Sequence, residues 1–271
     1  MPAAALAFAL AAAVFHALWN LLLARSDDVE SATAISLLTA VVVFIPVAAL
    51  TWRADARVVP FVIASGLLEL GYFALLAAAY SRAPLSVVYP VARGVAPVLV
   101  LLGVVVAGAG VGLSQVIGVL VIALGVMLVR GGSGFDARGV ALGLTVACAI
   151  ASYTLVDKHG VAHASPVTYL ELVMVIPALG YALAVARVKG VGALRAAAGP
   201  APALAGIVSF VAYAFVLAAL ARASAASVAA VRETSVVIAT VLAGVVLHEH
   251  VTRRRVLGAC VVVSGVAVLA R

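Results

Sequence analysis

The chain has 271 residues, of which 66% are hydrophobic and 10% are charged, and its formal net charge is +7. A soluble domain averages about 45–50% apolar and about 25% charged residues, so lipid must solvate most of this chain. The basic residues stand singly or in short groups between apolar stretches, as membrane-flanking residues do, and this distribution argues against nucleic-acid binding.

Ten apolar segments follow one another along the chain, and each has close to the ~20 residues that a helix needs to cross a bilayer. The first is read as a retained helix and not as a signal peptide, because its apolar run contains His16, Trp19 and Asn20. We therefore expect an all-α integral membrane protein of about ten transmembrane helices. In chain order the segments span 4–24, 31–51, 58–81, 84–107, 114–130, 138–158, 166–186, 201–222, 224–247 and 253–270.

The chain repeats itself at a constant offset of 140 residues. Residues 78–130 align with 218–270 without a gap, and fifteen of the 53 positions are identical. The repeated unit holds about five spans, which is an odd number, so two tandem copies must insert with opposite orientations. This is the inverted-repeat architecture of many secondary transporters. We divide the chain into two five-helix repeats, 1–130 and 131–271.

Glycines recur seven residues apart in the last span of each repeat. Gly118 and Gly125 align with Gly258 and Gly265, and residues seven apart lie on nearly one face of a helix. Glycines on one face let two membrane helices approach closely. We expect the fifth and tenth helices to pack together through these four residues.

Three stretches resemble the drug/metabolite transporter superfamily, in its ten-helix EamA type. Residues 15–25, Phe-His-Ala-Leu-Trp-Asn-Leu-Leu-Leu-Ala-Arg, resemble the Trp-containing first helix of that family. The pair Arg82-Ala-Pro and Arg222-Ala-Ser resembles its repeated turn between two helices, and the two glycine segments resemble the motif in the last helix of small multidrug-resistance proteins. The resemblance covers essentially the whole chain.

The resemblance implies a secondary active transporter, and we expect an exporter or a proton-coupled carrier that works by alternating access in the inner cell membrane. Charged and aromatic residues inside the spans suit a small polar or zwitterionic metabolite, such as an amino acid. Motifs of membrane-embedded enzymes such as His-Glu-x-x-His and Gly-x-Ser-x-Gly do not occur, so we expect no enzyme activity and no cofactor, and we expect a monomer. Small multidrug-resistance proteins have an essential Glu in their first helix, whereas this first helix has no acid. Their drug–proton exchange chemistry is therefore not carried over, and a multidrug efflux protein or a membrane-embedded enzyme remains the alternative.

The orientation of the termini is open between two arguments. The resemblance implies both termini in the cytoplasm, whereas the distribution of Arg and Lys among the connections favours the reverse. We take the family arrangement.

Charged residues inside the spans are the strongest indication of a site, because each costs about 2.5–3.5 kcal/mol at the bilayer centre. Under the repeat, Arg93 aligns with Glu233, so opposite charges should lie at related depths. Aromatic and polar residues at helical spacing accompany the charges, including a stripe of Tyr153 and Asp157. The expected substrate-binding residues are His16, Trp19, Asn20, Glu69, Tyr72, Tyr89, Arg93, Tyr153, Tyr213, Arg232 and Glu233.

Alternatives remain for parts of this set. Arg93, Arg232 and Glu233 could form a structural salt bridge that touches no solute. His248-Glu249-His250 could hold a metal, but it lacks the zincin spacing, and we expect no metal site there. Cys148 and Cys260 lie in apolar runs, and we expect neither a disulfide nor a metal site from them.

Overall fold

The computed structural model describes residues 1–23, 26–83, 85–130, 136–238, 241 and 252–271, which form helices and contain no strand. The helices are α1 (Ala3–Leu23), α2 (Val29–Leu50), η1 (Ala56–Val58), α3 (Val59–Tyr80), α4 (Leu85–Val106), α5 (Leu113–Arg130), α6 (Ala137–Gly160), α7 (Pro166–Lys189), α8 (Val191–Ala197), α9 (Pro200–Leu220), α10 (Ala225–Arg232) and α12 (Arg253–Ala270). Seven of them are long and apolar enough to cross a membrane.

Local sequence explains where the helices begin. Side chains of Asp28, Ser165, Ser224 and Thr252 accept hydrogen bonds from backbone N–H groups in the first turns of α2, α7, α10 and α12. Large apolar side chains such as Val42, Ile45 and Leu179 remain exposed on outward faces, as lipid contact requires. The chain is therefore an all-helical, multi-pass membrane protein.

The ends of nine expected segments agree with observed helix ends to within three residues. The segment expected at 224–247 behaves differently. Its first part is α10, which ends at Arg232, and a turn follows at Glu233 and Thr234 before helix resumes over 235–238. Thr234 donates its hydroxyl to the carbonyl of Val231, a local bond that competes with the helical ladder. The short surface helix α8 was not expected.

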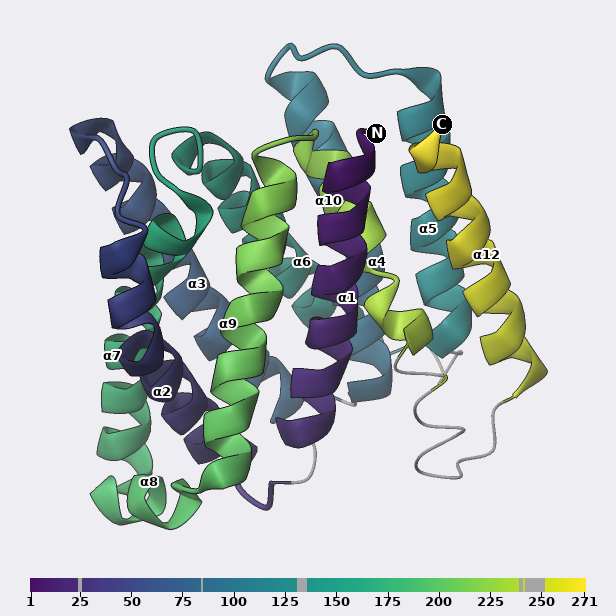
Figure 1. The fold of residues 1–271 in the computed structure, drawn as a ribbon. Helices are drawn as coiled ribbons and strands as arrows, with labels where there is room; N and C mark the ends of the chain where they lie inside the picture. Colours follow the sequence, from purple (N-terminus) through teal and green to yellow (C-terminus); the bar gives the residue numbers. More distant parts are fainter. Residues whose placement is uncertain (24–25, 84, 131–135, 239–240, 242–251) are drawn as a thin grey trace.

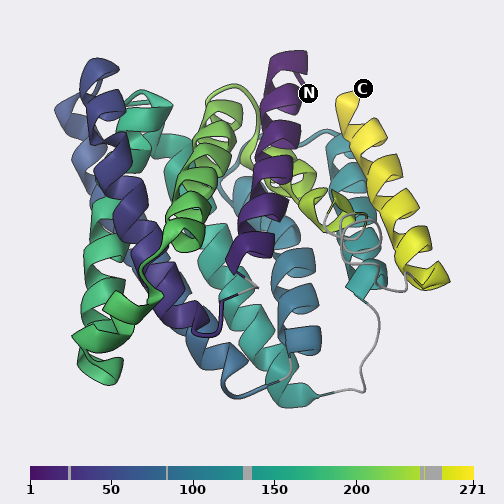
Figure 2. The same cartoon turned by 60° about the horizontal axis from the view of Figure 1, so that its bottom comes forward.

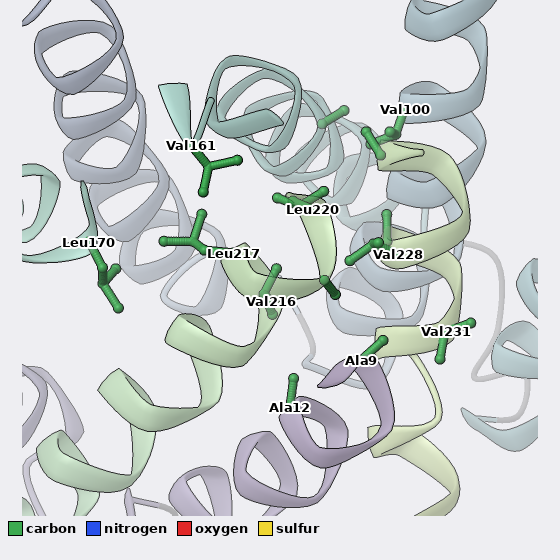
Figure 3. Packing of buried hydrophobic residues seen from close by; sticks show 14 of the residues in the cluster. Ala9, Ala12, Val100, Val161, Leu170, Val216, Leu217, Leu220, Val228 and Val231 are labelled. Carbon is green, nitrogen blue, oxygen red and sulfur yellow. The ribbon is translucent and has the colours of Figure 1, made fainter. Parts of the chain in front are cut away.

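The helices form one bundle with both termini at the same end (Figure 1). The pair α2 and α7 lies on one side of the bundle and the pair α5 and α12 on the other, as the rotated view in Figure 2 also shows. The N-terminal ammonium of Met1 donates to the carbonyl of Leu269, 3.1 Å away. The interior is filled by small and branched side chains from α1, α4, α9 and α10 (Figure 3).

The expected glycine contact is confirmed between α5 and α12. A Cβ atom added to Gly125 would lie 2.9 Å from the carbonyl oxygen of Gly258, and one added to Gly265 would lie 3.0 Å from that of Gly118. Gly118 therefore faces Gly265, and Gly125 faces Gly258, so the two helices are antiparallel. A larger residue at these positions would meet backbone, which cannot rotate away.

Candidate functional site

Charged side chains from α4 and α10 meet inside the bundle. Arg93 Nε lies 2.9 Å from Glu233 Oε2, and the exposed fractions of the two side chains are 6% and 1%. Arg93 also donates from Nη2 to the hydroxyl of Ser235, at 3.5 Å. Arg93 and Glu233, which align in the sequence repeat, thus contact each other directly. This is the salt bridge that the sequence leaves open as an alternative to solute binding.

Arg232 is the second buried arginine at this place. Its side chain is 2% exposed, and its Nε lies 3.9 Å from Glu233 Oε1, beyond hydrogen-bonding distance. Within the part of the chain that the structure describes, its Nε and Nη2 have no hydrogen-bond acceptor. Glu233 is therefore shared unequally between the two arginines, and Arg93 has the closer contact.

Helix α1 contributes a short polar stripe close to the arginines. Trp19 Nε1 donates to His16 Nδ1 at 3.1 Å, and Asn20 Nδ2 donates to the carbonyl of His16 at 2.7 Å. Because His16 Nδ1 accepts a hydrogen bond, the neutral ring carries its proton on Nε2. His16 interacts electrostatically with Arg93 and Arg232, which places it beside the charged group.

Three tyrosines form a chain of ring contacts across α3, α6 and α9. The ring centroids of Tyr72 and Tyr153 are 5.8 Å apart, and those of Tyr153 and Tyr213 are 6.1 Å apart. Tyr89 lies near the charged group as well, with the Arg93 guanidinium 6.0 Å from its ring centroid. The expected tyrosines thus come together with the arginines.

Glu69 on α3 is 5% exposed, and its Oε1 has no hydrogen-bond partner among the described residues. It interacts electrostatically with Asp157 and Arg232. No ion pair within 4 Å joins Glu69 to Arg232 in the described part of the chain.

Asp157 on α6 is a buried carboxylate that the expected site did not include. Its Oδ1 accepts from Ser65 at 2.5 Å and from Tyr169 at 2.9 Å, and its Oδ2 accepts from Tyr213. These donors come from α3, α7 and α9. The position of an acid inside a predicted span, on one stripe with Tyr153, was a signal, but its three donors lie far apart in the sequence.

A cavity of about 270 Å³ opens at the end of the bundle that holds the termini. It lies between the starts of α5 and α10, where Gln115 donates to Ser224 at 2.6 Å. None of the expected site residues lines it. The buried charges, and not this cavity, are the candidate site.

Among the described residues, no group of three His, Cys, Asp or Glu side chains could hold a metal ion, and Cys148 and Cys260 are free and exposed. His248, Glu249 and His250 lie outside the described residues.

Comparison with known proteins agrees with this arrangement. Residues 137–271, the second half of the chain, match the EamA-like transporter family. No curated protein matches the chain. A solved structure titled "Crystal structure of protein" is similar, with a TM-score of 0.76 and 19% sequence identity, over 99% of this chain and 96% of that one; at this identity the likeness shows the fold alone. With buried charges at the centre of an all-helical membrane bundle, the chain belongs to the EamA-like transporter family of the drug/metabolite transporter superfamily.

Proposed function

We propose that the protein is a secondary active transporter that moves a small polar or zwitterionic metabolite, such as an amino acid, by alternating access. In this proposal ten transmembrane helices form two inverted repeats, 1–130 and 131–271, in the inner cell membrane. The observation that carries it is a group of buried charges contributed by both repeats. Glu69 and Arg93 come from the first repeat, and Arg232 and Glu233 come from the second.

Helix contacts support the inverted repeat. Exchanging the repeats pairs α1 with α6, α2 with α7, α3 with α9, and α5 with α12. Under this exchange the contact of α1 with α9 becomes that of α6 with α3, and the contact of α2 with α9 becomes that of α7 with α3; all four contacts are present. Equivalent helices also touch each other, α2 with α7 and α5 with α12.

Two further glycines give the same support in atomic detail. A Cβ atom on Gly66 of α3 would lie 3.1 Å from the carbonyl oxygen of Val173 on α7. A Cβ atom on Gly206 of α9 would collide with the carbonyl oxygen of Ser36 on α2. Gly66 and Gly206 are 140 residues apart, which is the offset of the sequence repeat. Gly66 permits the close contact of α3 with α7, and Gly206 permits the equivalent contact of α9 with α2.

The central residues suit a solute with polar ends and an apolar body. Ionisable groups inside a bilayer bundle usually mark a solute or ion pathway. Arginine and glutamate can bind opposite charges of one solute, and aromatic rings can pack against its apolar part. The proposed binding residues are His16, Trp19, Asn20, Glu69, Tyr72, Tyr89, Arg93, Tyr153, Tyr213, Arg232 and Glu233. The rings of the three central tyrosines would form the wall.

Counterflow in proteoliposomes tests this function. Vesicles that contain the purified protein and a high internal concentration of one unlabelled L-amino acid should take up the labelled form transiently and saturably. Empty vesicles are the control. Failure of all twenty amino acids and of small amines and acids to show counterflow would contradict the proposal. Counterflow of lipophilic cations alone would favour multidrug efflux.

The role of Glu69 in energy coupling has its own test. If its carboxyl carries the coupling proton, Glu69→Gln should abolish uptake driven by a pH gradient while sparing exchange of solute for solute. Unchanged pH dependence and unchanged affinity in this variant would remove Glu69 from the site.

A further inference from the structure

Two buried arginines lie at the centre of the bundle, and their partners differ. Arg93 is held by Glu233 at 2.9 Å and donates to Ser235. Among the described residues, the one ion-pair approach to Arg232 is that of Glu233 Oε1 at 3.9 Å, and the Nε and Nη2 atoms of Arg232 have no hydrogen-bond acceptor. A guanidinium has five N–H donors, and burying them without acceptors is costly. Of the two arginines, Arg232 therefore has hydrogen-bonding capacity that the described part of the chain does not satisfy.

We propose that Arg232 is the residue that binds an acidic group of the solute, a carboxylate or another oxyanion, and that Arg93 is a positioning residue. This inference rests on the proposed transport function and names the chemical class that its site accepts. A planar guanidinium can make two parallel hydrogen bonds to a carboxylate, which gives both affinity and orientation. Arg93 holds Glu233 close to α4, so that Glu233 does not occupy the donors of Arg232.

A break in the helix at the same residues supports the inference independently. After Arg232, the N–H groups of Glu233 and Thr234 donate to Ala230 and Val231, three residues back instead of four. Irregular backbone inside a membrane is tolerated where it is buried in protein or lines a water-filled cavity. Interrupted helices form the solute sites of many secondary transporters. Arg232 stands at such an interruption.

The surroundings of Arg232 extend the recognition beyond a simple anion. Tyr153, Tyr213 and His16 interact with it electrostatically, from α6, α9 and α1. Glu69 does so from α3, and its Oε1 has no hydrogen-bond partner in the described part of the chain. When the acidic group of a solute binds Arg232, a cationic group on the same solute would lie within electrostatic reach of the Glu69 carboxylate. This arrangement favours a zwitterion over an acid of the same shape.

The test measures binding to the purified, full-length protein without any transport step. The thermal unfolding midpoint is recorded against concentration for each of the twenty L-amino acids, for the matching amines that lack the carboxylate, and for the matching acids that lack the amine. For leucine these analogues are 3-methylbutylamine and 4-methylpentanoate. At least one amino acid should stabilise the wild type, its acid more weakly, and its amine not at all.

Variants then assign the effect to Arg232. Arg232→Lys keeps the charge but loses the planar fork, so affinity for the carboxylate compound should fall about tenfold or more while the protein still folds. Arg82→Lys, at an exposed arginine, is the matched control and should bind as the wild type does. Wild-type affinity in both Arg232→Lys and Arg232→Gln would overturn the inference, as would a wild type that no carboxylate compound stabilises.

The outcome separates this inference from the transport proposal. Counterflow that persists with wild-type affinity in Arg232→Lys would leave the transporter intact and remove Arg232 from the site. Carboxylate binding that depends on Arg232, in a protein without counterflow, would support the role of Arg232 and contradict the transport proposal. The exchange Arg93→Glu with Glu233→Arg adds a check on Arg93. If Arg93 only holds residue 233, the exchange should restore transport that each single change impairs, whereas a folded but inactive double variant would contradict the positioning role.

Discussion

The end of α6 and the start of α7 lie at the end of the bundle that holds the termini, whereas the end of α1 and the start of α9 lie at the opposite end (Figure 1). The helices meet around a carboxylate near the first end and around apolar side chains near the second. The first contact, called here the Asp157 junction, consists of Ser65, Asp157, Tyr169 and Tyr213. The second, the Leu23 junction, consists of Leu23, Ala32 and Ala205. If the repeats are related as proposed, α3, α6 and α7 of the first junction correspond to α9, α1 and α2 of the second.

The difference shows that the two ends of the bundle are held together by different forces. Three hydroxyl groups donate to Asp157, and such bonds have direction and fixed partners. The Leu23 junction is made of apolar side chains, and one turn further along α2 a single hydroxyl, that of Ser36, donates to the carbonyl of Pro202 on α9 at 2.8 Å. Under alternating access, opening at the Asp157 junction must break three hydrogen bonds to one carboxylate, whereas opening beside the Leu23 junction separates apolar side chains and one hydroxyl–carbonyl bond.

Removing the carboxylate should have the largest effect. Asp157→Leu leaves three buried hydroxyls without their acceptor, and at about 0.6–1.7 kcal/mol for each hydrogen bond the loss in unfolding free energy should be about 2–5 kcal/mol. Thermal unfolding in detergent measures it. Asp157→Asn, which keeps one carbonyl oxygen, should lose less. An unfolding midpoint equal to that of the wild type in Asp157→Leu would mean that the junction is not held by these bonds.

The reverse substitution tests the apolar end. Leu23→Asp places a carboxyl group where Ala32 and Ala205 have no side-chain donor to offer, and should cost about 1–3 kcal/mol, the penalty of a buried polar group without a hydrogen-bond partner. The same unfolding measurement applies, with Leu23→Met as the volume-matched control. If Leu23→Asp were tolerated as well as Leu23→Met, the two junctions would not differ as described.

Single hydroxyl deletions should sharpen the comparison. Tyr169→Phe and Tyr213→Phe each remove one donor to Asp157, and each should cost about 0.6–1.7 kcal/mol in unfolding free energy. Tyr181→Phe is the matched control on α7, since the Tyr181 ring packs against Phe73 and its hydroxyl makes no hydrogen bond to Asp157. Equal losses in all three variants would contradict a specific role for the carboxylate.

The smallest effect is expected at the surface near the Leu23 junction. There Lys189 Nζ lies 2.7 Å from Asp28 Oδ1 and 2.7 Å from Glu30 Oε2. Hydrogen bonds from Lys189 and then Ser31 lower the pKa of Asp28 to about 2. A carboxyl group whose pKa is lowered by folding stabilises the folded protein at pH values above its ordinary pKa, and this stabilisation is lost as the pH falls towards 2. Lys189→Ala should cost about 0.2–1 kcal/mol at neutral pH and low salt. The acid-induced fall in unfolding midpoint between the ordinary carboxyl pKa and pH 2 should be smaller in this variant, because the folded pKa of Asp28 returns towards its unfolded value; an unchanged pH profile would show that the pair contributes nothing.

Much of the architecture could be predicted from the sequence because membrane helices are local. The length of each apolar run sets the helix bounds, and glycines seven residues apart identify the α5–α12 contact before any coordinates are known. The depth of Glu69, Arg93, Arg232 and Glu233 also follows from their positions in the runs. Which arginine holds Glu233 does not, because the sequence repeat aligns Arg93 with Glu233 and leaves Arg232 beside it as an equal candidate.

The sequence by itself determined the helical membrane fold, the close glycine contact and the buried charges, since each depends on composition or spacing within one or two helices. Only the tertiary structure decided the partners. Asp157 has donors from α3, α7 and α9, and the turn at Glu233 and Thr234 directs Glu233 towards Arg93 while Arg232 keeps donors that the described part of the chain does not satisfy. Hydrogen bonds and ion pairs between distant helices depend on side-chain geometry within about 3 Å, and no periodicity along a single helix specifies it.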